Sequence, residues 1–151
     1  MIPGCAAGLA FDGKGNLFRL DCRRGIVEKF GFGDKWTRPF KNQRAIGLAG
    51  DLVGTLWAID RLNVLFWDKD LNRWQKSTVP NKPHYLAAGM KDHVYLITKT
   101  RQIYRFSADS WIPVPNQVAD TIAVGHRGTI FITDRHNNIF KSVSQSTYTM
   151  P

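Results

Sequence analysis

The chain has 151 residues, of which 43% are hydrophobic and 22% are charged, a balance that fits one folded domain and excludes an intrinsically disordered protein. No apolar run approaches the ~20 residues of a membrane-spanning helix, and the N-terminal segment "MIPGCAAGLAF" lacks the basic start and the apolar core of a secretory signal. Twenty-one Lys and Arg residues against twelve Asp and Glu residues give a net charge of +9, which favours anionic partners such as nucleic acid, phosphorylated glycans or acidic proteins. We therefore expect no membrane insertion, and a protein that is cytoplasmic, unconventionally exported, or a domain of a longer chain.

One sequence unit recurs four times along the chain. Its copies are "NLFRLDCRRGIVEK" (16–29), "TLWAIDRLNVLFWD" (55–68), "HVYLITKTRQIYRF" (93–106) and "TIFITDRHNNIFKS" (129–142). The third residue of each copy is aromatic, and we call it the anchor. The anchors are spaced 39, 38 and 36 residues apart: Phe18, Trp57, Tyr95 and Phe131. A second aromatic residue follows each anchor at a near-constant distance: Trp36, Trp74, Trp111 and Tyr148. The spacing predicts a single domain of four repeats, at residues 6–44, 45–84, 85–120 and 121–151.

Each repeat has the pattern of four short strands, A to D. Strand A is a run of small residues, strand B alternates around the anchor aromatic, strand C contains a short "xIxRF"-like piece, and strand D holds the second aromatic. These β-branched and aromatic runs are separated by Gly, Asp and Asn, and no window has a sustained helical period. The predicted fold is all-β: a small β-propeller of four four-stranded antiparallel blades, closed by itself or part of, or completed into, a larger ring. Strand A would be innermost, where backbones crowd, and the aromatic residues would fill the wedges between blades.

This blade pattern resembles the tectonin repeat. The resemblance is clearest in "LAAGMKDHVYLITKTRQIYRFSADSWIPVP" (86–115) and "IAVGHRGTIFITDRHNNIFK" (122–141), and it covers essentially the whole chain. Tectonin proteins are β-propeller lectins that recognise glycans, often on bacterial surfaces or carrying methyl or phosphate groups. The resemblance therefore implies a carbohydrate-binding propeller. Thr98 stands where the other three units have Asp21, Asp60 and Asp134.

The sequence predicts no enzyme, no cofactor and no metal site. The segment "GFGDKW" (31–36) lacks the helix and the third glycine of a phosphate-binding loop. The four histidines fall in different repeats without metal-ligand spacing: His84, His93, His126 and His136. A Cys–His catalytic pair has no supporting local pattern. Because Asp21, Asp60 and Asp134 end strand B directly before a tight turn, we interpret them as structural residues that bind turn amides.

The charged residues divide unequally between the two faces of such a propeller. The B–C turns and D–A connections share one face, which collects ten basic residues: Arg23, Arg24, Arg38, Lys41, Arg44, Arg61, Lys82, Lys99, Arg101 and Arg135. Four acidic residues accompany them (Asp21, Asp60, Asp120 and Asp134), so the net charge of this face is ten minus four, +6. The opposite face carries six basic and seven acidic residues, a net charge of −1. The sequence thus predicts an electrostatically two-faced molecule.

Trp67 is predicted to be an exposed aromatic residue. It stands ten residues after its anchor, where the other units have Glu28, Arg105 and Lys141. A charge in three of four copies indicates a solvated position, so the Trp67 ring could stack on a sugar or contact a protein.

The leading hypothesis is a non-enzymatic lectin that recognises anionic or surface glycans through the basic face. The candidate ligand-binding residues are Arg24, Arg61, Trp67, Lys82, His84, Arg101, Arg135 and His136. Several weak sites in one ring would act through avidity. The alternative is a structural or adaptor subunit of a virion, a tail or a ribonucleoprotein, with the same face contacting protein. Direct nucleic-acid binding is the weaker variant, because the aromatic residues that could stack on bases are committed to the blade interiors.

The two cysteines, Cys5 and Cys22, are predicted to be neighbours. Strands A and B of the first unit flank "DGKG" (12–15), and a two-residue loop of Gly13 and Lys14 suits a type II′ hairpin turn. Paired positions then sum to 27, which places Cys5 opposite Cys22 in a non-hydrogen-bonded pair with Cα atoms ~4.5 Å apart. The redox state stays open at this point, because cytosolic thiols usually remain reduced.

Overall fold

The computed structural model describes residues 4–90, 93–125 and 127–142, and these form fifteen β-strands in four antiparallel sheets. The first sheet contains β1 (Ala6–Phe11), β2 (Leu17–Asp21), β3 (Val27–Gly31) and β4 (Lys35–Thr37). The second contains β5 (Gly47–Gly50), β6 (Leu56–Ile59), β7 (Val64–Asp68) and β8 (Arg73–Ser77). The third contains β9 (Pro83–Ala88), β10 (Val94–Thr98), β11 (Gln102–Ser107) and β12 (Ser110–Val118). The fourth contains β13 (Thr121–Val124), β14 (Ile130–Thr133) and β15 (Ile139–Ser142).

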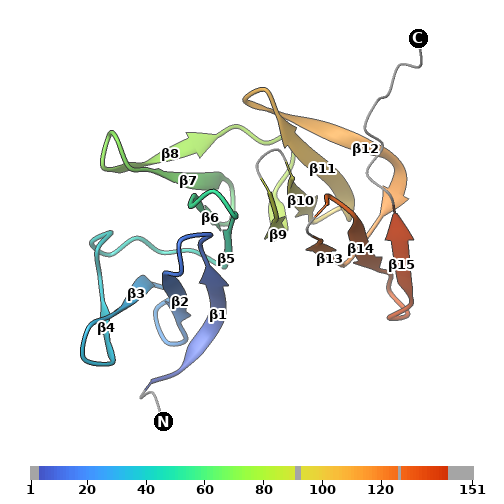
Figure 1. The fold of residues 1–151 in the computed structure, drawn as a ribbon. Helices are drawn as coiled ribbons and strands as arrows, with labels where there is room; N and C mark the ends of the chain where they lie inside the picture. Colours follow the sequence, from blue (N-terminus) through green and yellow to red (C-terminus); the bar gives the residue numbers. More distant parts are fainter. Residues whose placement is uncertain (1–3, 91–92, 126, 143–151) are drawn as a thin grey trace.

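The four sheets are the blades of a β-propeller, as predicted, and we number them blades 1 to 4 in chain order. Strands follow one another across each blade, and the first strand of each blade contacts the first strand of the next: β1 with β5, β5 with β9, and β9 with β13. Figure 1 shows the blades as an arc, with blade 1 at one end and blade 4 at the other. Tyr148, the predicted second aromatic of blade 4, lies outside the described residues. In the described part of the chain, no helix is long and apolar enough to cross a membrane.

We call the hub the centre of the arc, where the first strands of the blades, β1, β5, β9 and β13, contact one another. Small residues line the hub because the backbones of adjacent blades touch there. The Gly13 N–H donates to the Asp51 carbonyl at 2.8 Å, and the Leu52 N–H donates to the Gly89 carbonyl at 2.9 Å. A Cβ atom on Gly50 would lie 1.9 Å from the carbonyl oxygen of Phe11, so no larger residue fits without moving a strand. The structure therefore confirms the prediction that the small-residue strand is innermost.

The anchor aromatics fill the wedges between blades in three of the four repeats. Phe18 packs with residues of blade 2, Trp57 with residues of blade 3, and Tyr95 with residues of blade 4, and all three are buried. The fourth anchor, Phe131, is 42% exposed. The prediction that all four anchors are buried is thus wrong for Phe131, because among the described residues no blade follows blade 4.

The first hairpin differs from its prediction and still brings the cysteines together. Its turn is longer than expected: the Asp12 N–H donates to the Asn16 carbonyl, and Gly15, with φ +83°, takes the left-handed conformation of a three-residue loop. The Asp12 carboxylate stabilises this loop by accepting the N–H groups of Lys14 and Asn16. The residue numbers of paired positions in β1 and β2 consequently add to 28, as in the Phe11–Leu17 pair, and not to the predicted 27. The predicted register is therefore wrong by one residue.

A bulge in β1 then corrects the register. It lies between Ala6 and Gly8, and beyond it Ala6 pairs with Asp21, which restores the sum of 27. Cys5 and Cys22 are joined by a disulfide, with Cα atoms 5.6 Å apart. The predicted proximity of the two sulfurs is confirmed, although a bulge rather than the predicted turn produces it.

Candidate functional site

The predicted basic residues do share one face of the propeller. Backbone bonds tie the D–A connections to the B–C turns: the Ala45 N–H donates to the Gly25 carbonyl, and the Lys99 N–H to the Lys82 carbonyl, both at 2.9 Å. We call the basic turn face the surface formed by Arg23, Arg24, Arg38, Lys41, Arg44, Arg61, Lys82, Lys99, Arg101 and Arg135. Eight of these ten side chains are exposed and outside any ion pair among the described residues, the exceptions being Arg38 and Arg101.

Three of the four acidic residues of this face, Asp21, Asp60 and Asp134, are bonded to their own turns. Asp21 Oδ1 accepts the N–H groups of Arg23 and Arg24 at 3.0 and 2.5 Å. Asp60 Oδ1 accepts those of Leu62 and Asn63, both at 2.7 Å. The carboxylates therefore orient inward to the backbone, and the cationic side chains that follow them project outward.

These bonds keep the turn carboxylates ionised. At Asp21 the backbone N–H of Arg24 is the largest influence and lowers the pKa below its usual value, against a smaller opposing effect of burial. At Asp60 burial is the largest influence and acts to raise the pKa, but the N–H groups of Leu62 and Asn63, the Asn63 side-chain amide and the charge of Lys76 together outweigh it, so the pKa is again lowered. At Asp134 the Asn138 side-chain amide is the main cause of a lowered pKa. The interpretation of these three Asp residues as structural is confirmed.

Six of the predicted ligand-binding residues are exposed: Arg24, Arg61, Lys82, His84, Arg135 and His136. Arg24, Arg61 and Arg135 lie on the β2–β3, β6–β7 and β14–β15 turns, so each arginine is presented by a different blade. Arg101 is placed differently, because its Nε donates to Asp120 Oδ1 at 2.6 Å. This ion pair links the β10–β11 turn of blade 3 to the connection leading into blade 4.

Trp67 is half-buried, which corrects the prediction of an exposed ring. Its ring centroid lies 4.6 Å from that of Phe40 and 5.5 Å from that of Trp74. The error comes from counting a fixed ten residues from each anchor, because the B–C turns differ in length. The strand pairs place Trp67 level with Phe30 and Phe106, which are also aromatic.

Glu28 is likewise not in a solvated position. Only 5% of the residue is exposed, and its carboxylate accepts from Arg19 Nε at 2.9 Å and Arg38 Nε at 3.1 Å. The Arg19 guanidinium also lies 4.1 Å from the centre of the Trp36 ring. The inference of a solvated position from repeated charges is therefore wrong in blade 1.

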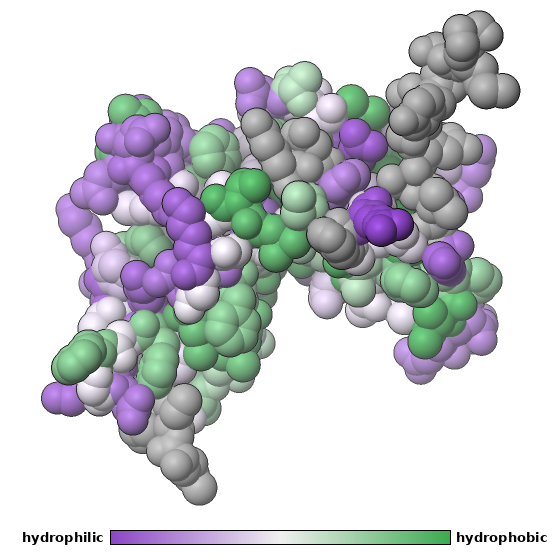
Figure 2. Space-filling view, in the orientation of Figure 1, coloured by the Kyte–Doolittle hydropathy of each residue, from purple (hydrophilic) through white to green (hydrophobic). Residues whose placement is uncertain are grey.

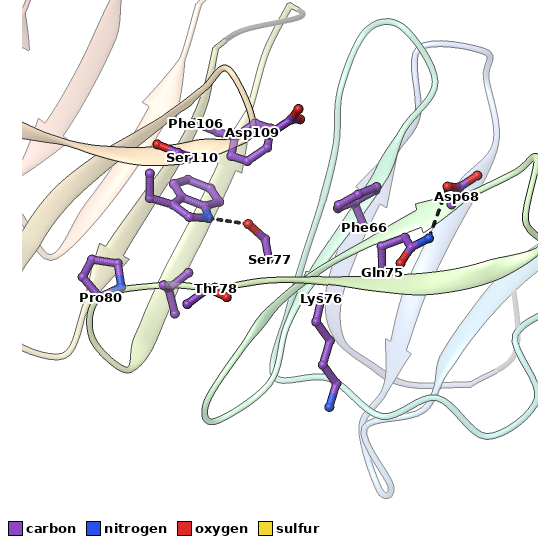
Figure 3. Close-up of a pocket in the computed structure, with 12 residues that line it drawn as sticks. Phe66, Asp68, Gln75, Lys76, Ser77, Thr78, Pro80, Phe106, Asp109 and Ser110 are labelled. Carbon is purple, nitrogen blue, oxygen red and sulfur yellow. Dashed lines mark hydrogen bonds between the residues drawn. The ribbon is translucent and has the colours of Figure 1, made fainter.

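A cleft of about 660 Å³ opens between the outer strands of blades 2 and 3, and sequence analysis did not find it. We call it the rim cleft. Phe66 of blade 2 and Phe106 of blade 3 lie on its opposite walls, and Trp111 donates its indole N–H to Ser77 Oγ across it at 2.9 Å (Figure 3). Asp68 and Asp109 line the same cleft. Lys76 and Gln75 line it as well, so the cleft combines aromatic walls with polar groups of both charges. No sequence signal indicated this cleft, because its walls come from two repeats.

Among the described residues, no group of three or more His, Cys, Asp and Glu side chains is placed to hold a metal ion. Cys5 and Cys22, which could have supplied thiolates, are bonded to each other.

Comparison with known proteins shows the fold. No protein-family model matches this sequence, and no curated protein matches it. Solved structures do match: a virginiamycin B lyase from Staphylococcus aureus aligns with a TM-score of 0.64 at 14% identity, over 97% of this chain and 58% of that chain. The WD40 repeats of RRP9 align with a TM-score of 0.66 at 12% identity, over 93% of this chain and 52% of theirs. YCF48 bound to a D1 peptide aligns with a TM-score of 0.69 at 13% identity, over 95% of this chain and 52% of that one.

At these identities the similarity establishes the β-propeller fold and nothing about chemistry. The similar structures include an enzyme as well as a WD40 protein and a peptide-bound protein. The chain spans little more than half the length of these structures.

Proposed function

We propose that this protein is a non-enzymatic interaction module whose basic turn face binds an acidic segment of a protein partner in a larger assembly. One observation carries the proposal: three of the four acidic side chains of this face are bonded to turn amides and the fourth, Asp120, to Arg101, while eight basic side chains are exposed outside any ion pair among the described residues. Such a face attracts and orients an anionic partner. The similarity to YCF48 bound to a peptide and to the WD40 repeats of RRP9 supports a protein partner.

The described groups with shifted pKa values have structural roles. They are carboxyls held by donors of their own hairpins, and Tyr95, whose pKa is raised mainly by burial in a wedge.

A binding titration with a fluorescent oligoglutamate peptide tests the proposal. We expect micromolar binding that weakens as salt is added, and a loss of roughly fivefold or more in the double variant Arg61→Ala/Arg135→Ala, because each exposed charge contributes about 0.5–1 kcal/mol. The matched control is Lys35→Ala/Lys69→Ala, which removes two exposed charges from the opposite face. An equal loss in both double variants, or no binding at low salt, would contradict the proposal.

Glycan binding is the second candidate, and one observation favours it. Arg61 and Arg135 each directly follow an Asp residue whose carboxylate accepts N–H groups of the B–C turn, in two different blades. Repeated presentation of one cation suits a ligand that itself repeats, and the resemblance to tectonin repeats points the same way. A glycan array that includes phosphorylated sugars would favour this candidate if its signals disappear in the Arg61→Ala/Arg135→Ala variant. An array without signals at low salt would reject it.

Nucleic acid is the third anionic class that the same experiments address. A binding titration with a single-stranded oligonucleotide of the same charge as the peptide distinguishes a nucleic-acid partner from a protein partner. Binding of the oligonucleotide with a steep salt dependence, without binding of the peptide, would replace the protein partner by nucleic acid.

A further inference from the structure

The three blade-to-blade interfaces of this chain are built alike. Each blade has an anchor face, which carries the anchor aromatic and the two residues that pair directly before and after the B–C turn. The next blade receives it on its opposite face, which we call the receiving face. Between blades 3 and 4, for example, Tyr95, Ile97 and Ile103 pack against Ile122, Ile130 and Ile132. Phe18, Leu20 and Val27 pack in the same way against Leu56, Ala58 and Leu65 between blades 1 and 2.

The anchor face of blade 4 has no such cover in the described residues. Ile139 is 73% exposed, whereas Ile103, which pairs at the same position in blade 3, is fully buried. Phe131 is exposed as described above, in contrast to the buried Tyr95. An apolar residue that is buried in every other repeat is thus open to solvent at this end of the arc.

The receiving face of blade 1 is open along β1, whereas Arg19 and Glu28 on β2 and β3 are nearly buried. Leu9 is 61% exposed, whereas Leu86 and Ile122 occupy the same position in blades 3 and 4 and are buried. Phe11 is 63% exposed at the adjacent edge of β1. Figure 2 shows hydrophobic surface over β1 on the open side of the arc, and again near the start of β15 at the other end.

Hydrogen bonds at the hub join only two of the three junctions. The carbonyls of Asp51 and Gly89 each accept an N–H group from the turn of the preceding blade. The Gly125 carbonyl at the corresponding place in blade 4 accepts only from Gly128 of its own turn among the described residues, as the Asp12 carbonyl of blade 1 accepts only from Gly15. The contact between blades therefore depends on the apolar faces rather than on these bonds.

We propose that a second copy of this chain completes the ring, with blade 4 of each copy packing its anchor face on the receiving face of blade 1 of the other. Among its described residues, the chain has one uncovered anchor face and one uncovered receiving face. Two copies related by a twofold axis along the central axis of the ring form two identical contacts, each between blade 4 of one copy and blade 1 of the other. Twice four blades gives a ring of eight, which is within the usual range of ~4–8 blades. Blades 1 and 4 of the described residues lie at opposite ends of the arc, so they do not cover each other (Figure 1).

The charged groups at this contact are compatible with burial. On the receiving face, Glu28 is already bonded to Arg19 and Arg38 within blade 1. On the anchor face, the main charged residue described is Lys141, which pairs with Phe131. Lys29 and Arg105 take the same position within the interfaces that the chain already forms, so a cation there does not prevent packing.

The mass of the protein in solution, measured by light scattering during size-exclusion chromatography, tests this proposal. We expect twice 17.1 kDa at micromolar concentrations. Ile139→Asp and Leu9→Asp should each raise the dissociation constant of the dimer at least about tenfold, because an unpaired carboxylate would be buried in both contacts. Phe32→Asp is the matched control, since Phe32 is fully exposed in the β3–β4 turn and should leave the dimer intact.

Mixing the two interface variants gives a sharper test. In a mixed ring both substitutions meet in one contact, and the other contact is wild type, so an equimolar mixture should recover dimer that neither variant forms alone. Circular dichroism of each variant verifies that it is folded, as expected for substitutions at exposed positions. A wild-type monomer would overturn the proposal and leave a different polypeptide as the missing half. A dimer that survives both variants, or a mixture that stays monomeric, would overturn the proposed ring.

Discussion

The indole N–H of Trp111 donates to Ser77 Oγ at 2.9 Å, and this bond joins blade 3 to blade 2 across the rim cleft. The two residues are 34 positions apart in sequence, almost one repeat. Trp111 also packs against Trp57 and Phe106, with ring centroids 6.4 and 5.1 Å away. Trp111 therefore belongs to the packed wedge and to the wall of the cleft at the same time.

Trp111→Phe should remove the bond and retain most of the packing. We expect a loss of about 1 kcal/mol in the free energy of unfolding, the usual contribution of one such hydrogen bond. Urea denaturation of Trp111→Phe, Ser77→Ala and the double variant would measure the coupling between the two side chains. If the two single losses simply add, the bond contributes nothing to stability.

The disulfide should stabilise the start of blade 1. It closes a loop between residues 17 apart in sequence, for which loop-closure entropy gives about 3 kcal/mol, or roughly 6–12 °C in Tm for a protein of this size. Thermal unfolding with and without a reducing agent measures this shift. The variant Cys22→Ser should unfold at the lower temperature in both conditions, and a Tm of Cys22→Ser that still responds to the reductant would exclude the disulfide as the cause.

Much of the fold was predictable because particular residue types recur at regular spacings along the sequence. Alternation around Trp57 and Tyr95, the small hub residues and the Asp residues before tight turns each have a local physical cause. Ile103 and Ile139 stand at the same place in the repeat, yet one is buried and the other exposed. This difference depends on whether a neighbouring blade exists, which no local pattern encodes.

Predictions that depended on aligning one repeat with another were less accurate. Trp67 was misplaced because the B–C turns of blades 1, 2 and 3 differ in length, so a fixed count from the anchor crosses to the other face of strand C. The same sensitivity explains the register error at Asp12, where a side chain stabilises a loop one residue longer than expected. The rim cleft depends on two such strands from different blades, and therefore lay beyond sequence analysis.

The two cations bound to Glu28 should differ in their effect on stability. The side chain of Arg19 is 12% exposed and that of Arg38 is 43% exposed. Glu28→Ala should cost about 3 kcal/mol in unfolding free energy, because it leaves a nearly buried guanidinium without its partner. Arg38→Ala should cost less than about 1 kcal/mol, as is usual for a solvent-exposed pair. Denaturant unfolding at one fixed protein concentration compares them, and equal losses would show that burial does not decide the strength of these pairs.

The turn carboxylate of Asp60 should make stability depend on pH in a defined direction. Its pKa in the folded protein is lowered from 3.8, because the hydrogen bonds from Leu62 and Asn63 and the charge of Lys76 together outweigh burial. The unfolded chain therefore binds the proton more readily, so this carboxylate stabilises the fold above the unfolded pKa, and that stabilisation is lost as the pH falls through the lower folded pKa. Asp60→Asn removes the titration and keeps a side-chain oxygen that can accept from the same turn.

We expect wild type to be more stable than Asp60→Asn by a constant amount from about pH 7 to pH 5, and the difference to shrink below about pH 4. Urea midpoints measured at half-unit pH steps give this difference directly. Leu62→Ala is the control in the same turn: Leu62 is exposed and does not titrate, so its difference from wild type should not change with pH. A wild-type advantage over Asp60→Asn that grew on acidification would contradict the role of the Asp60 carboxylate as the acceptor that closes this turn.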